Sequence, residues 1–127
     1  MTEIMVTEKK KSFTKRGLPA EVKTAIQTSL AKKAEDLCVL ALGELSGFTD
    51  YFVVMSGNSS RQNTAIADAI EGELRKTGLR PLSIEGRETA EWVLVDYGSF
   101  VVHVFSAKAR AYYSLEKLWG DAPRLDY

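Results

Sequence analysis

Four short segments of this chain are apolar at almost every position, and they constrain its fold more than any other feature. They span residues 37–42, 51–55, 92–95 and 100–105, and they are rich in residues that favour strands. A strand with one face in water alternates apolar and polar side chains, whereas a strand covered on both faces is apolar throughout. The segments therefore predict a sheet with both faces covered by other elements.

Helical periodicity supplies the elements that would cover this sheet. After Pro19, an apolar residue recurs at every fourth position, at Val22, Ile26, Leu30 and Ala34. This spacing predicts a helix with one apolar stripe.

A second helix is predicted from its caps as well as from its periodicity. Ser59 followed by Gln62 forms a capping box, in which the serine accepts from an early helical N–H and the glutamine reaches back. Gly78 is placed to end the helix in the left-handed conformation. The buried face of this helix is predicted to consist of Ile66, Ala69, Ile70 and Leu74.

The order of the elements predicts the fold class. A short strand is expected at residues 79–84, and the joint at residues 96–99 favours an antiparallel hairpin. A last helix is expected at residues 108–119. We therefore predict one α/β domain, a mixed β-sheet flanked by helices, over residues 18–121. Residues 1–17 are expected to be a disordered basic tail and residues 122–127 a C-terminal tail.

Charge and composition remove several classes of function. Lys plus Arg and Asp plus Glu number 17 each, so no basic excess favours direct, sequence-specific binding of nucleic acid. The single cysteine, Cys38, cannot form an internal disulfide. No apolar stretch is long enough to cross a bilayer, and the start of the chain lacks the apolar core of a secretory signal. We therefore expect a cytoplasmic protein without a membrane partner.

The polar residues of the chain give little support for catalysis. The turn Ser56-Gly57-Asn58-Ser59 lies between a strand and a helix, but it matches no phosphate-binding fingerprint. Nucleotidyl transfer needs paired carboxylates to hold metal ions, and no Asp-x-Asp occurs. Asp50 and Asp96 stand at strand ends, where Asp is a natural turn residue.

Cys38 and His103 could in principle form a nucleophile and its base. Both lie inside apolar strand segments, and Cys38 is interpreted as a small core residue. His103 lies between Val102 and Val104, so it faces opposite to both, toward a solvent-facing or hydrogen-bonded position. No spacing of His and Cys is typical of a metal site. We expect no catalytic group, no metal and no cofactor.

One strand face remains as a candidate interaction surface. Trp92, Leu94 and Asp96 share that face, while Val93 and Val95 share the other, which belongs to the core. Two interpretations stay open at this point. Either a helix covers the first face, or the face binds a partner with the tryptophan as its anchor.

Several motifs in order resemble the ribosomal silencing factors, also called Iojap-like proteins. The first comprises residues 48–54, the pair Ser56-Gly57, and residues 59–62 and 66–68. The second comprises the pair Glu85-Gly86 and residues 90–98 and 101–105. The C-terminal helix matches at Arg110, Tyr113, Leu115, Glu116, Leu118 and Trp119. The resemblance covers residues 18–121.

The resemblance implies a fold and a function. Members of this family resemble nucleotidyltransferases without the catalytic carboxylates, and they bind ribosomal protein L-fourteen of the large subunit. They thereby block association of the subunits and repress translation when nutrients are scarce, and some form homodimers when free. The alternative is a divergent nucleotidyltransferase-like enzyme with a site around Ser56-Gly57 and Asp50.

The resemblance also implies where the partner binds. The family ties the tryptophan-containing strand motif to the ribosomal contact, which carries over to Trp92, Leu94 and Asp96. Ribosomal proteins are generally basic, so Glu85, Glu91 and Asp96 around an aromatic anchor would complement one. These five residues are the predicted partner-binding set.

Overall fold

The computed structural model describes residues 13–127, so most of the predicted basic tail, residues 1–12, lies outside the described part. The elements are α2 (Ala20–Ala31), β1 (Glu35–Ala41), α3 (Gly43–Ser46), β2 (Tyr51–Gly57), α4 (Ser60–Lys76), β3 (Ser83–Glu85), β4 (Trp92–Asp96), β5 (Phe100–Ser106), α5 (Ala107–Tyr113), α6 (Leu115–Leu118) and β6 (Arg124–Asp126). None of the described helices combines the length and hydropathy needed to span a bilayer.

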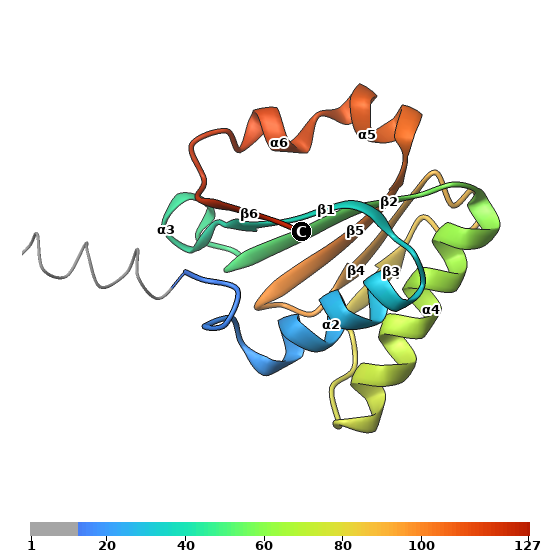
Figure 1. Ribbon diagram of the computed structural model, residues 1–127, viewed down its shortest axis with the longest axis horizontal. Helices are drawn as coiled ribbons and strands as arrows, with labels where there is room; N and C mark the ends of the chain where they lie inside the picture. Colours follow the sequence, from blue (N-terminus) through green and yellow to red (C-terminus); the bar gives the residue numbers. More distant parts are fainter. Residues whose placement is uncertain (1–12) are drawn as a thin grey trace, which may run out of the picture.

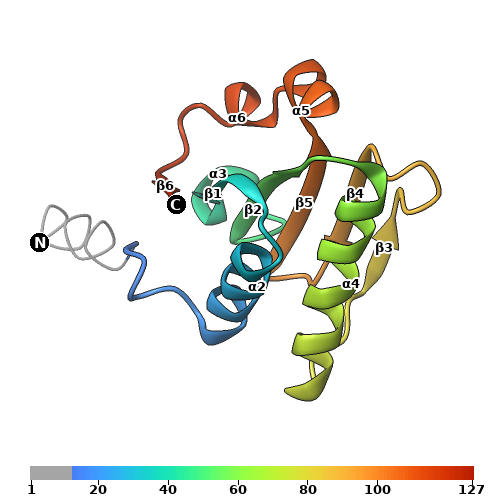
Figure 2. The ribbon, with the colours of Figure 1, turned by 45° about the vertical axis from the view of Figure 1, so that its right-hand side comes forward.

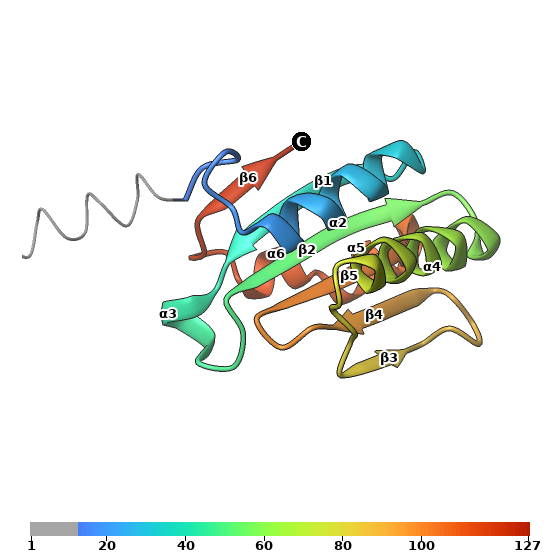
Figure 3. The ribbon, with the colours of Figure 1, turned by 90° about the horizontal axis from the view of Figure 1, so that it is seen from below.

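The strands form one six-stranded sheet in the order β3-β4-β5-β2-β1-β6 (Figure 3). Strands β2 and β5 are parallel, and every other pair is antiparallel. The mixed sheet is confirmed, as is the β4–β5 hairpin, in which Asp96 pairs with Val101.

Helices cover both faces of the sheet, as the continuous apolar strands predict. Helices α2 and α4 lie on one side, and α5 and α6 lie on the other (Figures 1 and 2). The α2/α4 core receives Val93 and Val95, both fully buried. The α5/α6 core is smaller and contains Cys38, Leu40, Leu42, Phe52, Val54, Val101, Phe105, Ala109 and Ala122.

The predicted stripe of α2 is only half right. Val22 and Ile26 are buried, but Leu30 is 44% exposed, and Ala25 and Ser29 are buried instead. A helix turns 100° per residue, so a spacing of exactly four residues drifts by about 40° at each step. The stripe has therefore rotated away from the core by the position of Leu30.

Helix α4 has the predicted ends. Ser59 Oγ accepts from the Gln62 N–H at 3.1 Å, and Gln62 Oε1 accepts from the Asn58 N–H. At the other end Gly78 has φ of +90°, and the Leu79 N–H donates to the Leu74 carbonyl at 3.0 Å. This is the hydrogen-bond pattern of a glycine-capped helix end.

The predicted C-terminal helix is divided in two. Ser114 adopts a left-handed φ of +49° between α5 and α6, and its hydroxyl donates to the Ala111 carbonyl at 2.7 Å. A serine that bonds to nearby backbone competes with the helical pattern. The break separates α5 from α6, which follow one another on the same side of the sheet (Figure 1).

The predicted C-terminal tail includes a strand, so the expected end of the folded domain at residue 121 is wrong. Strand β6 pairs antiparallel with β1, with Leu125 opposite Val39. The region assigned to the basic tail also contacts the domain at its described end, because the Phe13 ring stacks on Tyr51 at 6.2 Å. A three-residue strand is too short to show periodicity, which is why the sequence did not reveal it.

Candidate partner-binding surface

Strand β4 turns Trp92, Leu94 and Asp96 toward the side of the sheet that carries α5 and α6. All three are partly exposed, whereas their neighbours Val93 and Val95 are completely buried. The first interpretation, in which a helix covers this face, is confirmed only at one end, and the second stays a prediction. Helix α5 covers its Trp92 end, where the Tyr113 ring lies 4.6 Å from the indole, and the rest of the face remains partly open to a partner.

Trp92 is held on three sides. Its ring stacks on Phe105, its cross-strand partner, at 4.9 Å and 27°. Its indole Nε1–H donates to His103 Nδ1 at 3.0 Å. With Tyr113 on the third side, the indole has a fixed orientation at the edge of the α5/α6 core.

His103 is buried and hydrogen-bonded, so of the two positions left open by the sequence it takes the hydrogen-bonded one. Only 2% of the residue is exposed. Burial lowers the pKa of the imidazole to about 3. The histidine is therefore neutral at physiological pH.

Cys38 and His103 do not form a dyad. In the sheet register both pair with Val54, which places strand β2 between them. Two strand spacings amount to roughly 9–10 Å, beyond the reach of proton transfer. Burial also raises the pKa of the Cys38 thiol, so the thiolate is disfavoured.

Four of the five predicted residues share one face. Glu85 pairs with Leu94 across β3 and β4, so its exposed carboxylate lies on the same side as Trp92 and Asp96. Asp96 also has a structural role, because its Oδ1 accepts from the Gly98 N–H at 2.8 Å in the hairpin turn.

Glu91 lies just outside the strand, before Trp92. Its Oε2 accepts from the Ser106 hydroxyl at 2.7 Å, next to the start of α5. The carboxylate is therefore anchored at one end of the surface rather than in its centre.

Sequence reasoning missed apolar side chains that lie on the same side of the sheet. Leu118 is 71% exposed and Phe48 is 61% exposed. Rings connect Phe48 to the site: Phe48 and Phe52 each lie about 6 Å from Trp119, and Phe52 packs against His103 at 4.3 Å. Phe48 lies in a loop, where no periodicity could have revealed it.

An ion-pair cluster fixes α5 and α6 to the sheet beside this surface. The Arg110 guanidinium binds both oxygens of Glu116, at 2.8 and 3.2 Å, and donates to Ser56 Oγ at 3.1 Å. The hydrogen bonds from Arg110 and the charges of Arg110 and Arg124 hold the pKa of Glu116 below its usual value. Arg124 adds a bond from β6 at 3.0 Å.

The geometry does not support the alternative enzyme site. Asp50 precedes β2, while Ser56 and Gly57 end it, so they lie roughly 20 Å apart along the strand. The space beside Gly57 is filled by Asn63, whose side-chain oxygen occupies the place of a Cβ. Among residues 13–127, no cluster of three or more His, Cys, Asp or Glu could hold a metal ion.

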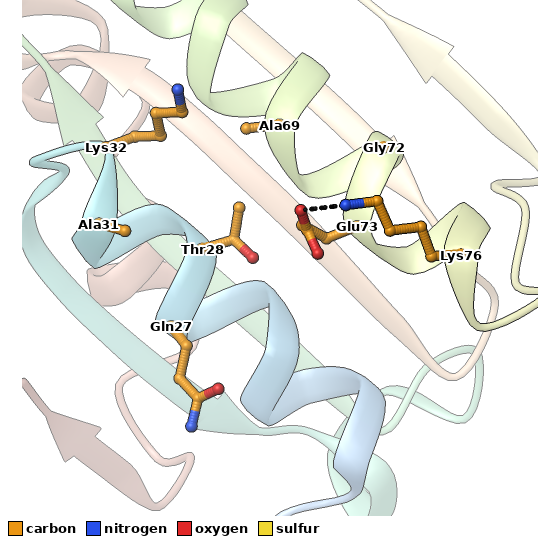
Figure 4. A pocket seen from close by; sticks show the side chains of 8 residues that line it. All are labelled: Gln27, Thr28, Ala31, Lys32, Ala69, Gly72, Glu73 and Lys76. Carbon is orange, nitrogen blue, oxygen red and sulfur yellow. Dashed lines mark hydrogen bonds and ion pairs between the residues drawn. The ribbon is translucent and has the colours of Figure 1, made fainter.

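An open groove lies on the opposite side of the sheet, between α2 and α4 (Figure 4). Its residues are Gln27, Thr28, Ala31, Lys32, Ala69, Gly72, Glu73 and Lys76. Glu73 and Lys76 neutralise each other at 3.0 Å. The groove contains a single carboxylate, and that carboxylate is already paired.

Comparison with known proteins points to one family. The family described as "Ribosomal silencing factor during starvation" matches residues 15–127. A relative in Bacillus subtilis, named a ribosomal silencing factor, is 47% identical over 75% of this chain and 80% of its own length. A mouse relative, named mitochondrial assembly of ribosomal large subunit protein 1, is 31% identical over 81% of this chain and 46% of its own length.

Solved structures agree with the fold. A crystal structure from Chromobacterium violaceum has a TM-score of 0.77 at 37% identity and covers 79% of this chain and 83% of its own. A Bacillus halodurans structure has a TM-score of 0.74 at 39% identity and covers 84% of this chain and 96% of its own.

Proposed function

Because this chain belongs to the ribosomal silencing factor family, we propose that it binds the large ribosomal subunit through ribosomal protein L-fourteen and so prevents the small subunit from joining. Translation then falls when nutrients are limiting. The action is steric, since a bound protein that occupies the joining surface needs no catalytic group. The site of action is the cytoplasm.

One observation carries the proposal: a partly exposed tryptophan is held in a fixed orientation on a strand face edged with acids. Trp92 is the aromatic anchor, and Leu94 extends the apolar centre of the surface. A tryptophan at the centre of an interface is a frequent hot spot. The acidic rim suits a basic ribosomal protein.

The acids are expected to act at different steps. The Glu85 side chain is exposed and, unlike Asp96, takes no part in the hairpin turn. It therefore contributes mainly to the rate of association and to its salt dependence. Asp96 and Glu91 are each partly engaged by a hydrogen bond within the chain. They add charge to the rim without needing to move.

The test is binding to isolated large subunits and its effect on joining. Purified protein should co-sediment with large subunits and lower the yield of whole ribosomes from separated subunits. Trp92→Ala should weaken binding to L-fourteen by roughly thirtyfold, the equivalent of about 2 kcal/mol. Leu30→Ala is the matched control, because Leu30 is a partly exposed apolar residue on the opposite side of the sheet.

Unchanged subunit joining at saturating protein would refute the proposed function. Equal loss of affinity in Trp92→Ala and Leu30→Ala would retain the function but remove the β4 face from the interface.

A further inference from the structure

We infer that His103 is a positioning residue: its Nδ1 holds the indole of Trp92 in the orientation that the ribosomal partner recognises. The inference rests on the proposed function, because it assumes that Trp92 is the anchor. His103 is buried beneath the surface and does not itself contact the partner.

The sheet register explains how the two side chains meet. Trp92 pairs directly with Phe105, whereas His103 pairs with Leu94. His103 is therefore the diagonal neighbour of Trp92 on the same face, at a separation that aromatic side chains can bridge. The indole spans this diagonal and donates to Nδ1 at 3.0 Å.

The hydrogen bond fixes the tautomer of the imidazole. An indole N–H can only donate, so Nδ1 must carry a lone pair and the single ring proton must be on Nε2. That Nε2 has no hydrogen-bond partner in the described part of the chain. Its ring packs instead against Phe52, edge to face, at 4.3 Å.

A phenylalanine at position 103 would fill a ring-shaped space here and would have no unsatisfied Nε2–H, but it would remove the acceptor of the Trp92 indole. A buried N–H without a partner costs free energy, so histidine is not the choice that packing alone favours. The pKa of about 3 also means that the ring does not change its charge near neutral pH. What histidine adds over phenylalanine is an acceptor for the Trp92 indole.

The acceptor matters because stacking alone does not fix an indole. The second side-chain torsion of tryptophan has broad, roughly two-fold wells, and the contacts with Phe105 and Tyr113 are ring contacts rather than directional hydrogen bonds. A hydrogen bond to Nε1 selects one orientation. An anchor that is already oriented loses less conformational freedom when the partner binds.

The test uses His103→Phe, which keeps a ring but removes the acceptor. We expect an unchanged or higher urea midpoint, together with about a threefold to tenfold loss of affinity for L-fourteen, the range that corresponds to ordering one side chain. The indole N–H resonance of Trp92 should move and exchange faster with solvent. Cys38→Ala is the control for altered packing, because Cys38 lies in the same core but two strands from His103.

Two further variants keep the inference falsifiable if His103→Phe folds poorly. Trp92→Phe removes the indole donor. In the Trp92→Phe background, His103→Phe should therefore cause no further loss of affinity, which a double-mutant cycle measures. His103→Asn places an oxygen near the position of Nδ1 and should recover part of the affinity and of the slow indole exchange.

The outcomes separate the inference from the function on which it rests. Failure of the wild-type chain to bind L-fourteen overturns both. Normal binding by the wild type, with the same affinity in His103→Phe, overturns the inference alone. Equal losses in His103→Phe and Cys38→Ala also overturn it, because packing would then explain the effect.

Discussion

At the residue scale, His103 shows what strand alternation can and cannot establish. Its position between Val102 and Val104 correctly predicts that it faces the other side of the sheet. Whether that side is exposed to solvent depends on residues from other elements. The rings of Trp92 and Phe52 pack against the imidazole, and the only histidine of the protein is buried.

The buried histidine predicts a specific loss of stability in mild acid. The pKa of His103 is about 3 when folded and near 6.5 when unfolded, so the unfolded chain binds more protons between these values. The free energy of unfolding therefore rises with pH in this window and falls as pH drops below 6.5. From pH 7 to pH 5 the loss should be about 2 kcal/mol.

Urea denaturation at pH 7 and pH 5 measures this loss. His103→Phe should remove most of the difference, because carboxylates titrate mainly below pH 5. A wild-type free energy of unfolding that is the same at both pH values would show that the imidazole reaches water or is charged in the folded protein.

At the element scale, the C-terminal helix is divided in two, whereas sequence periodicity predicts one continuous helix. Apolar positions continue through Ser114, so the pattern alone favours one helix. The break instead brings Glu116, six residues on, back to Arg110. A continuous helix makes side-chain pairs at three and four residues, not six, so this contact depends on the break.

This geometry predicts that Glu116→Ala destabilises the protein by about 2 kcal/mol. The Arg110 side chain is only 12% exposed, and without Glu116 its charge would be left largely unpaired away from water. Glu73→Ala is the matched control, since its pair with Lys76 is exposed and should cost roughly 0.5 kcal/mol or less. The two midpoints of urea unfolding give the comparison, and equal shifts would mean that the Arg110 pair is also effectively in water.

At the scale of the whole molecule, the sequence predicts the central strands correctly but not the C-terminal boundary of the fold. The hairpin predicted at residues 92–95 and 100–105 is confirmed, as is the mixed sheet with helices on both faces. Strong apolar runs carry this information because burial on both faces leaves little room for polar residues. The neighbours of Trp92 across the surface, such as Tyr113 and Phe48, come from helices and loops whose placement is set by tertiary packing.

The C-terminal segment gives the sharpest test of the corrected boundary. Deleting residues 122–127 removes strand β6 and with it the antiparallel pairing to β1. It also removes the Arg124 bond to Glu116, the buried Ala122 and the bond from the Tyr127 N–H to the Leu37 carbonyl at 3.0 Å. Backbone hydrogen bonds contribute about 1 kcal/mol each, so the deletion should cost about 3 kcal/mol or more.

The deletion should also promote aggregation, because β1 would become an exposed apolar edge strand. Urea unfolding and the concentration dependence of light scattering measure the two effects. Arg124→Ala is the matched control, since it removes the ion pairs but leaves the strand pairing intact. If the point variant lost as much stability as the deletion, side-chain charge rather than strand pairing would hold the C-terminus. If the shortened chain kept its midpoint and did not aggregate, the fold would end near residue 121 after all.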